Sequence, residues 1–313
     1  MRFSNRVTDL LGVDIPIVQA PMGWIARSRL ASAVSNAGAM GIIETSSGEL
    51  DAVRDEIAAM RRLTDRPFGV NIAQAFVSDP SIVDFVVEQG VGFVTTSAGD
   101  PTRYTAQLKA AGLTVFHVVP TLRAALKAVE AGVDGLVVEG GEGGGFKNPR
   151  DVATMVLLPL VCAAVDVPVI AAGGIVDGAT MAAAFALGAE GVQMGTRMVA
   201  TVESPIHANW KDAIVGAAET DTVFLNRRHR PALRALRTPY SERLDADDDD
   251  VMARFGDVRA VYFGGDLDAG IALSGQVAGR IDEVEPVADV IERTVAEFAD
   301  CIDGLAARYG TVN

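Results

Sequence analysis

The stretch PVIAAGGIVDGATMAAAFALGAEGVQMGT, residues 168–196, decides the fold class. It begins with one short apolar run, PVIAAGG, and ends with a second, GVQMGT, and residues 179–187 between them have helical periodicity. Gly188 follows the helix at the position where a left-handed residue usually ends one. Two nearly continuous apolar strands joined by a helix are typical of a parallel sheet that helices cover. The unit therefore predicts an α/β protein.

Six more apolar runs precede this unit, and segments with helical periodicity separate them. Eight β/α units within about 200 residues favour a closed (β/α)8 barrel, the TIM-barrel fold. A doubly wound open sheet is the alternative, but no strand is followed by G-x-G-x-x-G, and G-x-x-x-x-G-K-[ST] does not occur. The predicted strands are residues 15–22, 40–45, 68–73, 91–98, 114–119, 135–140, 168–174 and 191–196.

The strand–helix alternation ends after the eighth predicted strand. Residues 227–237 are rich in arginine and have two interpretations: a helix face that is solvated or paired with local acids, or a group of side chains that attracts an anionic substrate. Residues 287–307 have the pattern of an amphipathic helix. We predict a barrel over 1–220, a smaller α-rich substrate or lid segment over 221–275, and a C-terminal segment, 276–313, that packs back on the barrel.

Charge and composition exclude several classes of function. With 27 Lys and Arg against 41 Asp and Glu, the net charge is −14, which disfavours binding to nucleic acid or to an anionic membrane. Three histidines and two distant cysteines form no metal-binding motif and no disulfide framework. The N-terminus lacks the pattern of a signal peptide, and no apolar run reaches the ~18 residues that span a bilayer. We expect a cytoplasmic protein without a metal, whose partner is a small molecule.

Barrel enzymes carry their chemistry at the carboxyl ends of the strands. These ends supply small, amide and hydroxyl groups and few acids or bases, which suits a flat polar cofactor better than hydrolysis by paired carboxylates. After strands seven and eight, Ala172-Gly173-Gly174 and Gly195-Thr196 offer backbone N–H groups and a hydroxyl at the frequent phosphate site of this fold. Tight turns without a ligand are the alternative explanation of these glycines.

Three further strand ends stand out. Asn71 is either a turn-former or an amide that binds a cofactor ring, and His117 is either a structural or a catalytic histidine. Strand six is followed by EGGEGGGFKN, residues 139–148, in which five of the six positions 140–145 are glycine. Glycines are favoured where another group approaches the backbone closely or where φ is positive.

Several motifs together resemble those of the nitronate monooxygenase (2-nitropropane dioxygenase-like) family. They are IVQAPMGW, PFGVN, EGGEGGG, PVIAAGGI, GVQMGTR and GGDLDAGIALSGQVAG, and the resemblance covers residues 8–291. The family also includes FMN-dependent NADH:quinone reductases and flavin-dependent enoyl-ACP reductases. The resemblance implies an FMN-binding TIM barrel with a smaller α-rich substrate domain, and an oxidoreductase activity.

The resemblance also implies which residues bind FMN. The phosphate would lie on the glycines and the threonine after strands seven and eight, and the ring against the loop after strand one. The implied set is Ala20, Pro21, Met22, Gly23, Asn71, His117, Glu139, Gly144, Ala172, Gly173, Gly174, Gly195, Thr196 and Gln276.

The chain departs from the family pattern at the end of the glycine loop, where the family has a catalytic histidine. Phe146 occupies this position and Lys147 follows it. A phenyl ring carries no proton, so we do not expect this site to deprotonate a neutral nitroalkane. Oxidation of a preformed alkyl nitronate with O2 needs no base and is the predicted reaction.

Two alternatives to nitronate oxidation stay open. In the first, NADH or NADPH reduces the flavin, which then reduces an enoyl thioester (ACP or CoA) or a quinone, with the proton from water, His117 or Lys147. In the second, the protein binds flavin but has lost its activity. The oligomeric state is left open, with a homodimer as one form.

Overall fold

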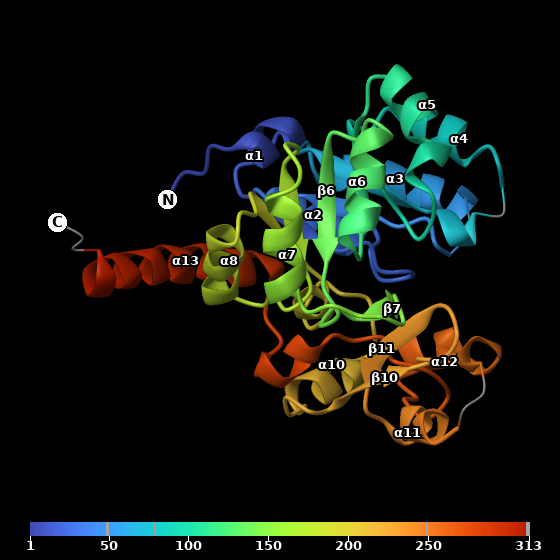
Figure 1. The fold of residues 1–313 in the computed structure, drawn as a ribbon. Coiled ribbons are helices and arrows are strands. Elements are labelled where there is room, and N and C mark those ends of the chain that lie inside the picture. The colour runs from blue at the N-terminus through green and yellow to red at the C-terminus, as the bar shows by residue number, and fades with distance from the viewer. Residues whose placement is uncertain (48–49, 78, 248–249, 311–313) are drawn as a thin grey trace.

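A sheet of eight parallel strands forms the centre of the molecule (Figure 1). The computed structural model describes residues 1–313 except 48–49, 78, 248–249 and 311–313. The strands are β1 (Ile17–Gln19), β2 (Gly41–Ile43), β3 (Phe68–Ala73), β4 (Phe93–Ser97), β5 (Thr114–Val119), β6 (Gly135–Glu139), β8 (Val169–Ala172) and β9 (Gly191–Met194). They lie in the order β1-β9-β8-β6-β5-β4-β3-β2, and a parallel bridge between Val18 and Met40 joins the two ends. The predicted (β/α)8 barrel is confirmed.

Helices surround the barrel (Figure 1). They are α1 (Arg6–Leu11), α2 (Ser28–Asn36), α3 (Leu50–Leu63), α4 (Ile82–Glu88), α5 (Thr105–Ala110), α6 (Leu122–Glu130), α7 (Thr154–Cys162) and α8 (Gly178–Ala186). The predicted C-terminal helix is α13 (Val287–Tyr309), which packs on α8 and α2. None of the helices in the described chain combines the length and the apolar composition needed to cross a bilayer.

Two aromatic side chains in the barrel interior explain two strand glycines. The rings of Phe93 and Phe116 pack edge to face with their centroids 5.4 Å apart. A Cβ at Gly135 would lie 2.3 Å from the Phe116 ring, and one at Gly69 would lie 2.6 Å from the Phe93 ring. The glycines therefore make room for the aromatic layer, which supports the strand ends above it.

A second, smaller sheet lies at the carboxyl end of the barrel strands. It is antiparallel and consists of β10 (Thr222–Leu225), β11 (Ala232–Leu236) and β7 (Gly145–Lys147), in that order. Figure 1 shows this sheet and its helices below the barrel. The remaining α-helices are α9 (Thr196–Val199), which directly follows β9, and α10 (Ala208–Val215), α11 (Pro239–Asp245) and α12 (Val258–Tyr262).

The small sheet corrects the expectation of a helix face within residues 221–275. The segment contains two strands besides its helices, and the arginine-rich run 227–237 forms the turn of a hairpin and all of β11. Leu233 and Ala235 enter an apolar cluster, while Arg234 lies between them in the strand and points to the other face. This alternation of apolar and basic residues is a strand signal. The boundaries 1–220, 221–275 and 276–313 stay a proposal.

Arg234 joins the small sheet to the glycine loop. Its Nε donates to the carbonyl of Gly141 at 2.7 Å, and its Nη2 lies 3.7 Å from a carboxylate oxygen of Asp151. The guanidinium stacks over the ring of Phe224, 5.0 Å from its centroid. Because Arg234 and Gly141 are buried, their hydrogen bond holds the loop in place without competition from water, whereas Asp151 is exposed.

We predict that Arg234→Met destabilises the protein, because the Gly141 carbonyl and the Asp151 carboxylate lose their partner. The expected cost is about 1–3 kcal/mol in the free energy of unfolding, measured by urea denaturation. The control is Arg237→Met, because Arg237 is exposed and pairs with exposed Glu242 at 3.7 Å. Equal stability of the two variants would contradict a bracing role for Arg234.

Candidate active site

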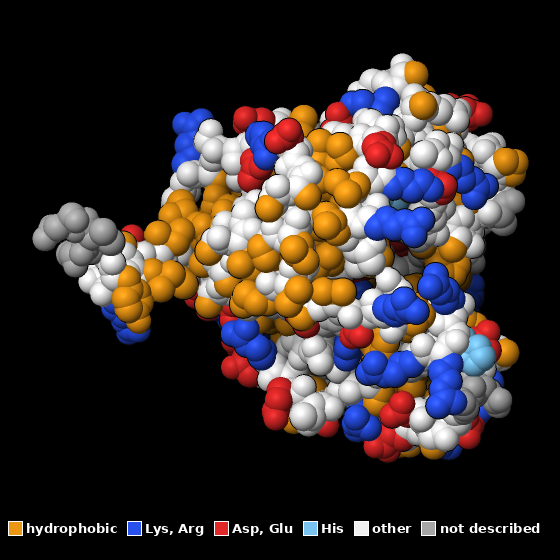
Figure 2. Space-filling model, viewed as in Figure 1, with side chains coloured by type: hydrophobic (Ala, Val, Ile, Leu, Met, Phe, Trp, Pro, Cys, Tyr) orange, Lys and Arg blue, Asp and Glu red, His pale blue; other side chains and the backbone are white. Residues whose placement is uncertain are grey.

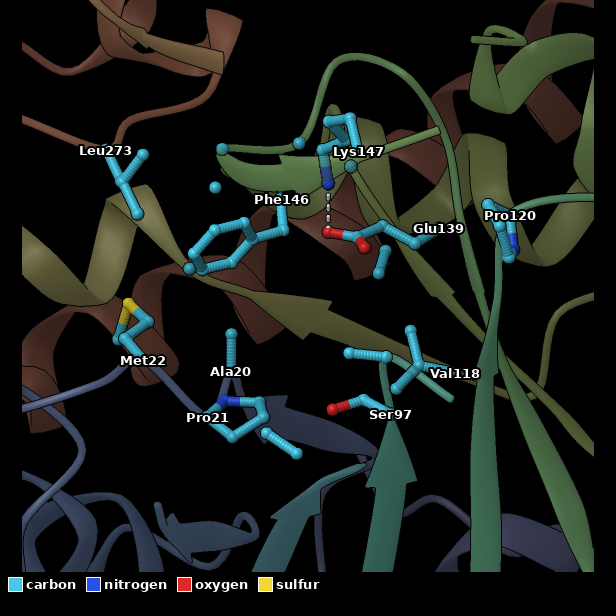
Figure 3. Close-up of a pocket in the computed structure, with 18 of the residues that line it drawn as sticks. Ala20, Pro21, Met22, Ser97, Val118, Pro120, Glu139, Phe146, Lys147 and Leu273 are labelled. Carbon is cyan, nitrogen blue, oxygen red and sulfur yellow. Dashed lines mark ion pairs between the residues drawn. The ribbon is translucent and has the colours of Figure 1, made fainter. Parts of the chain in front are cut away.

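A cavity of about 800 Å³ lies between the carboxyl ends of the barrel strands and the small sheet. Its walls come from both parts, because barrel loops and residues of the 221–275 segment both line it. Figure 3 shows Phe146, Lys147 and Glu139 on one side of this space, and Ala20, Pro21 and Ser97 on the other. The position agrees with the site expected for a barrel enzyme.

The loop after β1 forms one wall of the cavity, and a buried carboxylate holds it. Glu44 is fully buried and accepts from the backbone N–H of Trp24 at 3.2 Å and of Ser47 at 3.0 Å. It also accepts from the Ser46 hydroxyl at 2.8 Å and pairs with Arg27 at 2.8 Å. The carboxylate thus has partners for both oxygens, which a buried charge requires. The loops after β1 and β2 are thereby fixed to each other.

The glycines after β8 and β9 form an open cradle. Gly173 and Gly174 have φ values of 86° and 80°, in the left-handed region. A Cβ at Gly174 would make only ordinary van der Waals contact, 3.9 Å from Glu142, so the protein does not crowd this position. The Thr196 hydroxyl accepts from the Gly275 N–H at 2.8 Å and keeps its own hydrogen for another acceptor. This arrangement suits a phosphate group.

The glycine loop after β6 makes room for other parts of the same chain. A Cβ at Gly144 would lie 2.6 Å from the backbone of Ser274. At Gly143 a Cβ would lie 2.8 Å from both Glu139 Oε1 and Lys147 Nζ. The glycines therefore allow a close approach of the segment around Ser274 and of an ion pair, while Gly143, Gly144 and Gly145 still line the cavity.

Phe146 and Lys147 lie in β7 and both line the cavity. The Phe146 ring packs against Phe76 at a centroid distance of 5.0 Å and stacks on Phe255 at 6.2 Å. The buried ammonium of Lys147 forms an ion pair with Glu139 at 2.5 Å (Figure 3). An apolar wall and a paired cation thus stand side by side.

Asn71 and His117 are engaged within the protein. The Asn71 amide donates to the Thr95 hydroxyl at 2.9 Å and to the Ser97 hydroxyl at 3.3 Å. His117 Nδ1 lies 2.7 Å from the hydroxyl of Thr96. Burial lowers the pKa of His117 to about 4, so its imidazole is neutral at pH 7. Both residues line the cavity, yet both have structural partners.

Gln193 is a cavity residue that the sequence interpretation missed. It lies buried in β9, and its Oε1 has no hydrogen-bond partner among the described residues. A buried amide without a partner costs free energy unless a ligand supplies one. The signal was present in the sequence, because Gln193 interrupts the apolar strand GVQM.

The comparisons with known proteins agree with this geometry. A model of the family "Nitronate monooxygenase" matches residues 4–297. The chain belongs to the nitronate monooxygenase family. It is therefore a flavin-dependent oxidoreductase, since enzymes of this family and its structural neighbours use flavin.

Three relatives show how the family varies. The chain is 34% identical to the nitronate monooxygenase of Paraburkholderia phytofirmans, over 71% of this chain and 73% of the relative. It is 32% identical to a Rhodococcus jostii enzyme named (3aS,4S,5R,7aS)-5-hydroxy-7a-methyl-1-oxo-octahydro-1H-indene-4-carboxyl-CoA dehydrogenase, over 97% of this chain and 98% of that one. The structure of FabK from Thermotoga maritima is similar with a TM-score of 0.92 and 41% identity, covering 97% and 99% of the two chains.

The cavity of this nitronate monooxygenase family member fits a flavin. The open cradle at Gly174 and the free hydrogen of Thr196 suit a phosphate, and the unpartnered Oε1 of Gln193 suits a ring N–H. The residues expected to bind the cofactor all line the cavity except Gln276, which is exposed, although its neighbours Gly275 and Val277 do line it. We therefore leave Gln276 out of the proposed flavin site. Among the described residues no group of His, Cys, Asp and Glu could hold a metal ion.

The lowered pKa of His117 predicts a pH-dependent stability. An unfolded histidine titrates near pH 6.5, so the unfolded chain binds the additional proton between about pH 6.5 and 4. The free energy of unfolding should therefore rise with pH across this window, by roughly 2–3 kcal/mol from this residue. Urea denaturation at several pH values measures it.

Two variants distinguish the contribution of His117 to this pH dependence from that of the other titrating groups. His117→Asn should flatten the rise between pH 4 and 6.5. The control is His207→Asn, because His207 caps α10 by accepting from the Asn209 N–H, and asparagine can keep that bond. The same slope in His117→Asn as in the control would contradict the assignment.

Proposed function

We propose that the protein binds FMN in this cavity and oxidises preformed alkyl nitronates with O2. Among the described residues, the carboxylates and the histidine that line the inner cavity are already engaged, and this observation supports a substrate that needs no base. Glu139 is paired with Lys147, and the Glu142 carboxylate accepts from the N–H and the hydroxyl of Thr154. His117 is a weak base because its pKa is about 4.

The proposed binding of FMN uses three parts of the wall. Gly173, Gly174, Gly195 and Thr196 hold the phosphate. The loop Ala20–Gly23, fixed through Glu44, supports the ring, and Gln193, Asn71 and His117 lie along its polar edges, with Ala172, Glu139 and Gly144 in contact. When bound, FMN accepts electrons from the substrate and passes them to O2.

Lys147 is the proposed residue for orienting the nitronate. The residue lines the cavity, and its buried ammonium, held against Glu139, gives this wall a positive group close to a bound anion. Glu139 keeps this ammonium in place. Phe146 excludes water from the same region and moves no proton.

Oxygen uptake tests the proposal. The FMN-loaded protein should consume O2 with propyl-2-nitronate at least about 100-fold faster than with neutral 2-nitropropane, because no positioned base deprotonates the neutral form. Phe146→His should raise the rate with 2-nitropropane by about 10-fold or more, and Phe146→Leu, the matched control without a base, should not. Absence of oxygen uptake with any nitronate would refute the proposal.

A second candidate is the reduction of an enoyl thioester or a quinone by NADH or NADPH. The apolar side of the cavity, formed by Met22, Phe76, Phe146 and Leu273, favours it because it accommodates more than a small nitronate. The relative that is named as a carboxyl-CoA dehydrogenase supports the same candidate. In this reaction the Lys147 ammonium would donate the proton, because His117 is neutral.

Anaerobic mixing separates the second candidate from the first. If the second candidate is right, NADH or NADPH bleaches the flavin in the wild type and in Lys147→Met, since hydride transfer needs no protein acid. Turnover with crotonyl-CoA or a quinone should fall by about 100-fold or more in Lys147→Met. A flavin that neither nucleotide bleaches would exclude the reductase.

A further inference from the structure

The mouth of the cavity is basic although the whole chain has a net charge of −14. Figure 2 shows Lys and Arg side chains gathered over the small sheet and beside α6. Two basic residues, Arg230 on the hairpin turn between β10 and β11 and Lys127 on α6, line the cavity itself. They lie on opposite parts of the molecule, so they flank the entrance.

At this entrance the two cations differ in whether a carboxylate of the described chain neutralises them. Lys127 pairs with Asp100 at 2.6 Å. For Arg230, no carboxylate lies within ion-pair distance in the part of the chain that the structure describes. An exposed arginine at the rim of a largely apolar cavity raises the local concentration of anions.

The turn that carries Arg230 is held in one conformation. The Asn226 side chain, which is buried, donates to the Pro231 carbonyl at 2.7 Å and to Asp250 at 3.1 Å. Its own carbonyl oxygen accepts from the Val251 N–H at 3.0 Å. Because the backbone around Arg230 is fixed, less conformational entropy is lost when its guanidinium binds a ligand.

The distribution of polarity indicates the kind of ligand. The ion pair of Lys147 and Glu139 lies in the cavity wall, and Phe76, Phe146 and Leu273 provide an apolar side. A small nitronate has its charge at the reacting atoms and has no use for a second cation at the rim. A ligand with a reactive or apolar end and a distant anionic tail would use both.

We propose that Arg230 binds the phosphate groups of a nucleotide tail whose reactive end enters the cavity. The planar fork of arginine binds phosphate oxygens in pairs, which makes it suited to a diphosphate. The tail belongs to a CoA thioester or to a nicotinamide dinucleotide, which share an adenosine diphosphate. The inference rests on the proposed flavin site, because that site defines the reactive end of the cavity.

Binding measurements on the FMN-loaded protein test this site. Dissociation constants for CoA, 3′-dephospho-CoA, NADPH and NADH are measured by calorimetry at low and moderate salt, with pantetheine and nicotinamide riboside as phosphate-free probes. Arg230→Met should weaken the phosphate-bearing ligand by about 10-fold or more and reduce the salt dependence of its binding. Phosphate-free probes should bind the variant and the wild type equally.

The matched control is Arg227→Met. Arg227 lies on the same hairpin, is exposed, stacks on Phe224 with its Cζ 4.4 Å from the ring centroid, and is not among the residues that line the cavity. It should change the affinities by less than about 2-fold. A preference for CoA or for NADPH identifies the source of the tail.

Two results would overturn the inference. One is equal affinity of Arg230→Met and Arg227→Met for every phosphate-bearing probe, and the other is equal binding of CoA and pantetheine to the wild type. Neither measurement needs turnover, so the result stands apart from the oxygen-uptake test. A protein that takes up no FMN would instead refute the proposed function itself.

Discussion

The glycine loop after β6 ends as the edge strand of another sheet. Residues 145–147 of the loop, β7, pair with β11, with Phe146 opposite Leu233 and Lys147 opposite Ala232. Since successive side chains of a strand point to opposite faces, this register determines how the two side chains are presented. The pairing thus fixes both Phe146 and Lys147, and the arginine brace from Arg234 to Gly141 holds the loop on which they lie.

The same pairing explains how a site without a free base is kept rigid. Phe146 completes an aromatic cluster with Phe76 from the barrel and Phe255 from the 221–275 segment. The Lys147 ammonium forms an ion pair with Glu139 at the end of β6. Each side chain of β7 therefore connects the small sheet to the barrel, and the cavity wall is built across the two parts.

Much of the fold could be predicted from the sequence, because its signals are local. The apolar runs, the helical segments and the glycines after them lie where the structure has strands, helices and their ends. The place of Gly173, Gly174 and Thr196 in the cavity wall was predictable for the same reason, since they follow directly on their strands. Their positions in a closed barrel bring them to one rim.

Other features depend on contacts between distant residues. The pairing of β7 with β11 joins residues 145–147 to residues 232–234, and no local pattern in the glycine loop indicates it. The need for glycine at position 144 comes from the close approach of the Ser274 backbone, which lies far along the chain. The exposure of Gln276 beside two cavity residues likewise depends on the turn that it occupies.

The shared strand has a consequence for how ligands reach the cavity. A lid that swings away from a barrel normally leaves the catalytic loop behind. Here the small sheet contains β7, so any outward movement of the sheet would carry Phe146 and Lys147 with it and dismantle the wall. Passage of a ligand beside the turn at Arg230 and Pro231, which both line the cavity, would leave that wall intact.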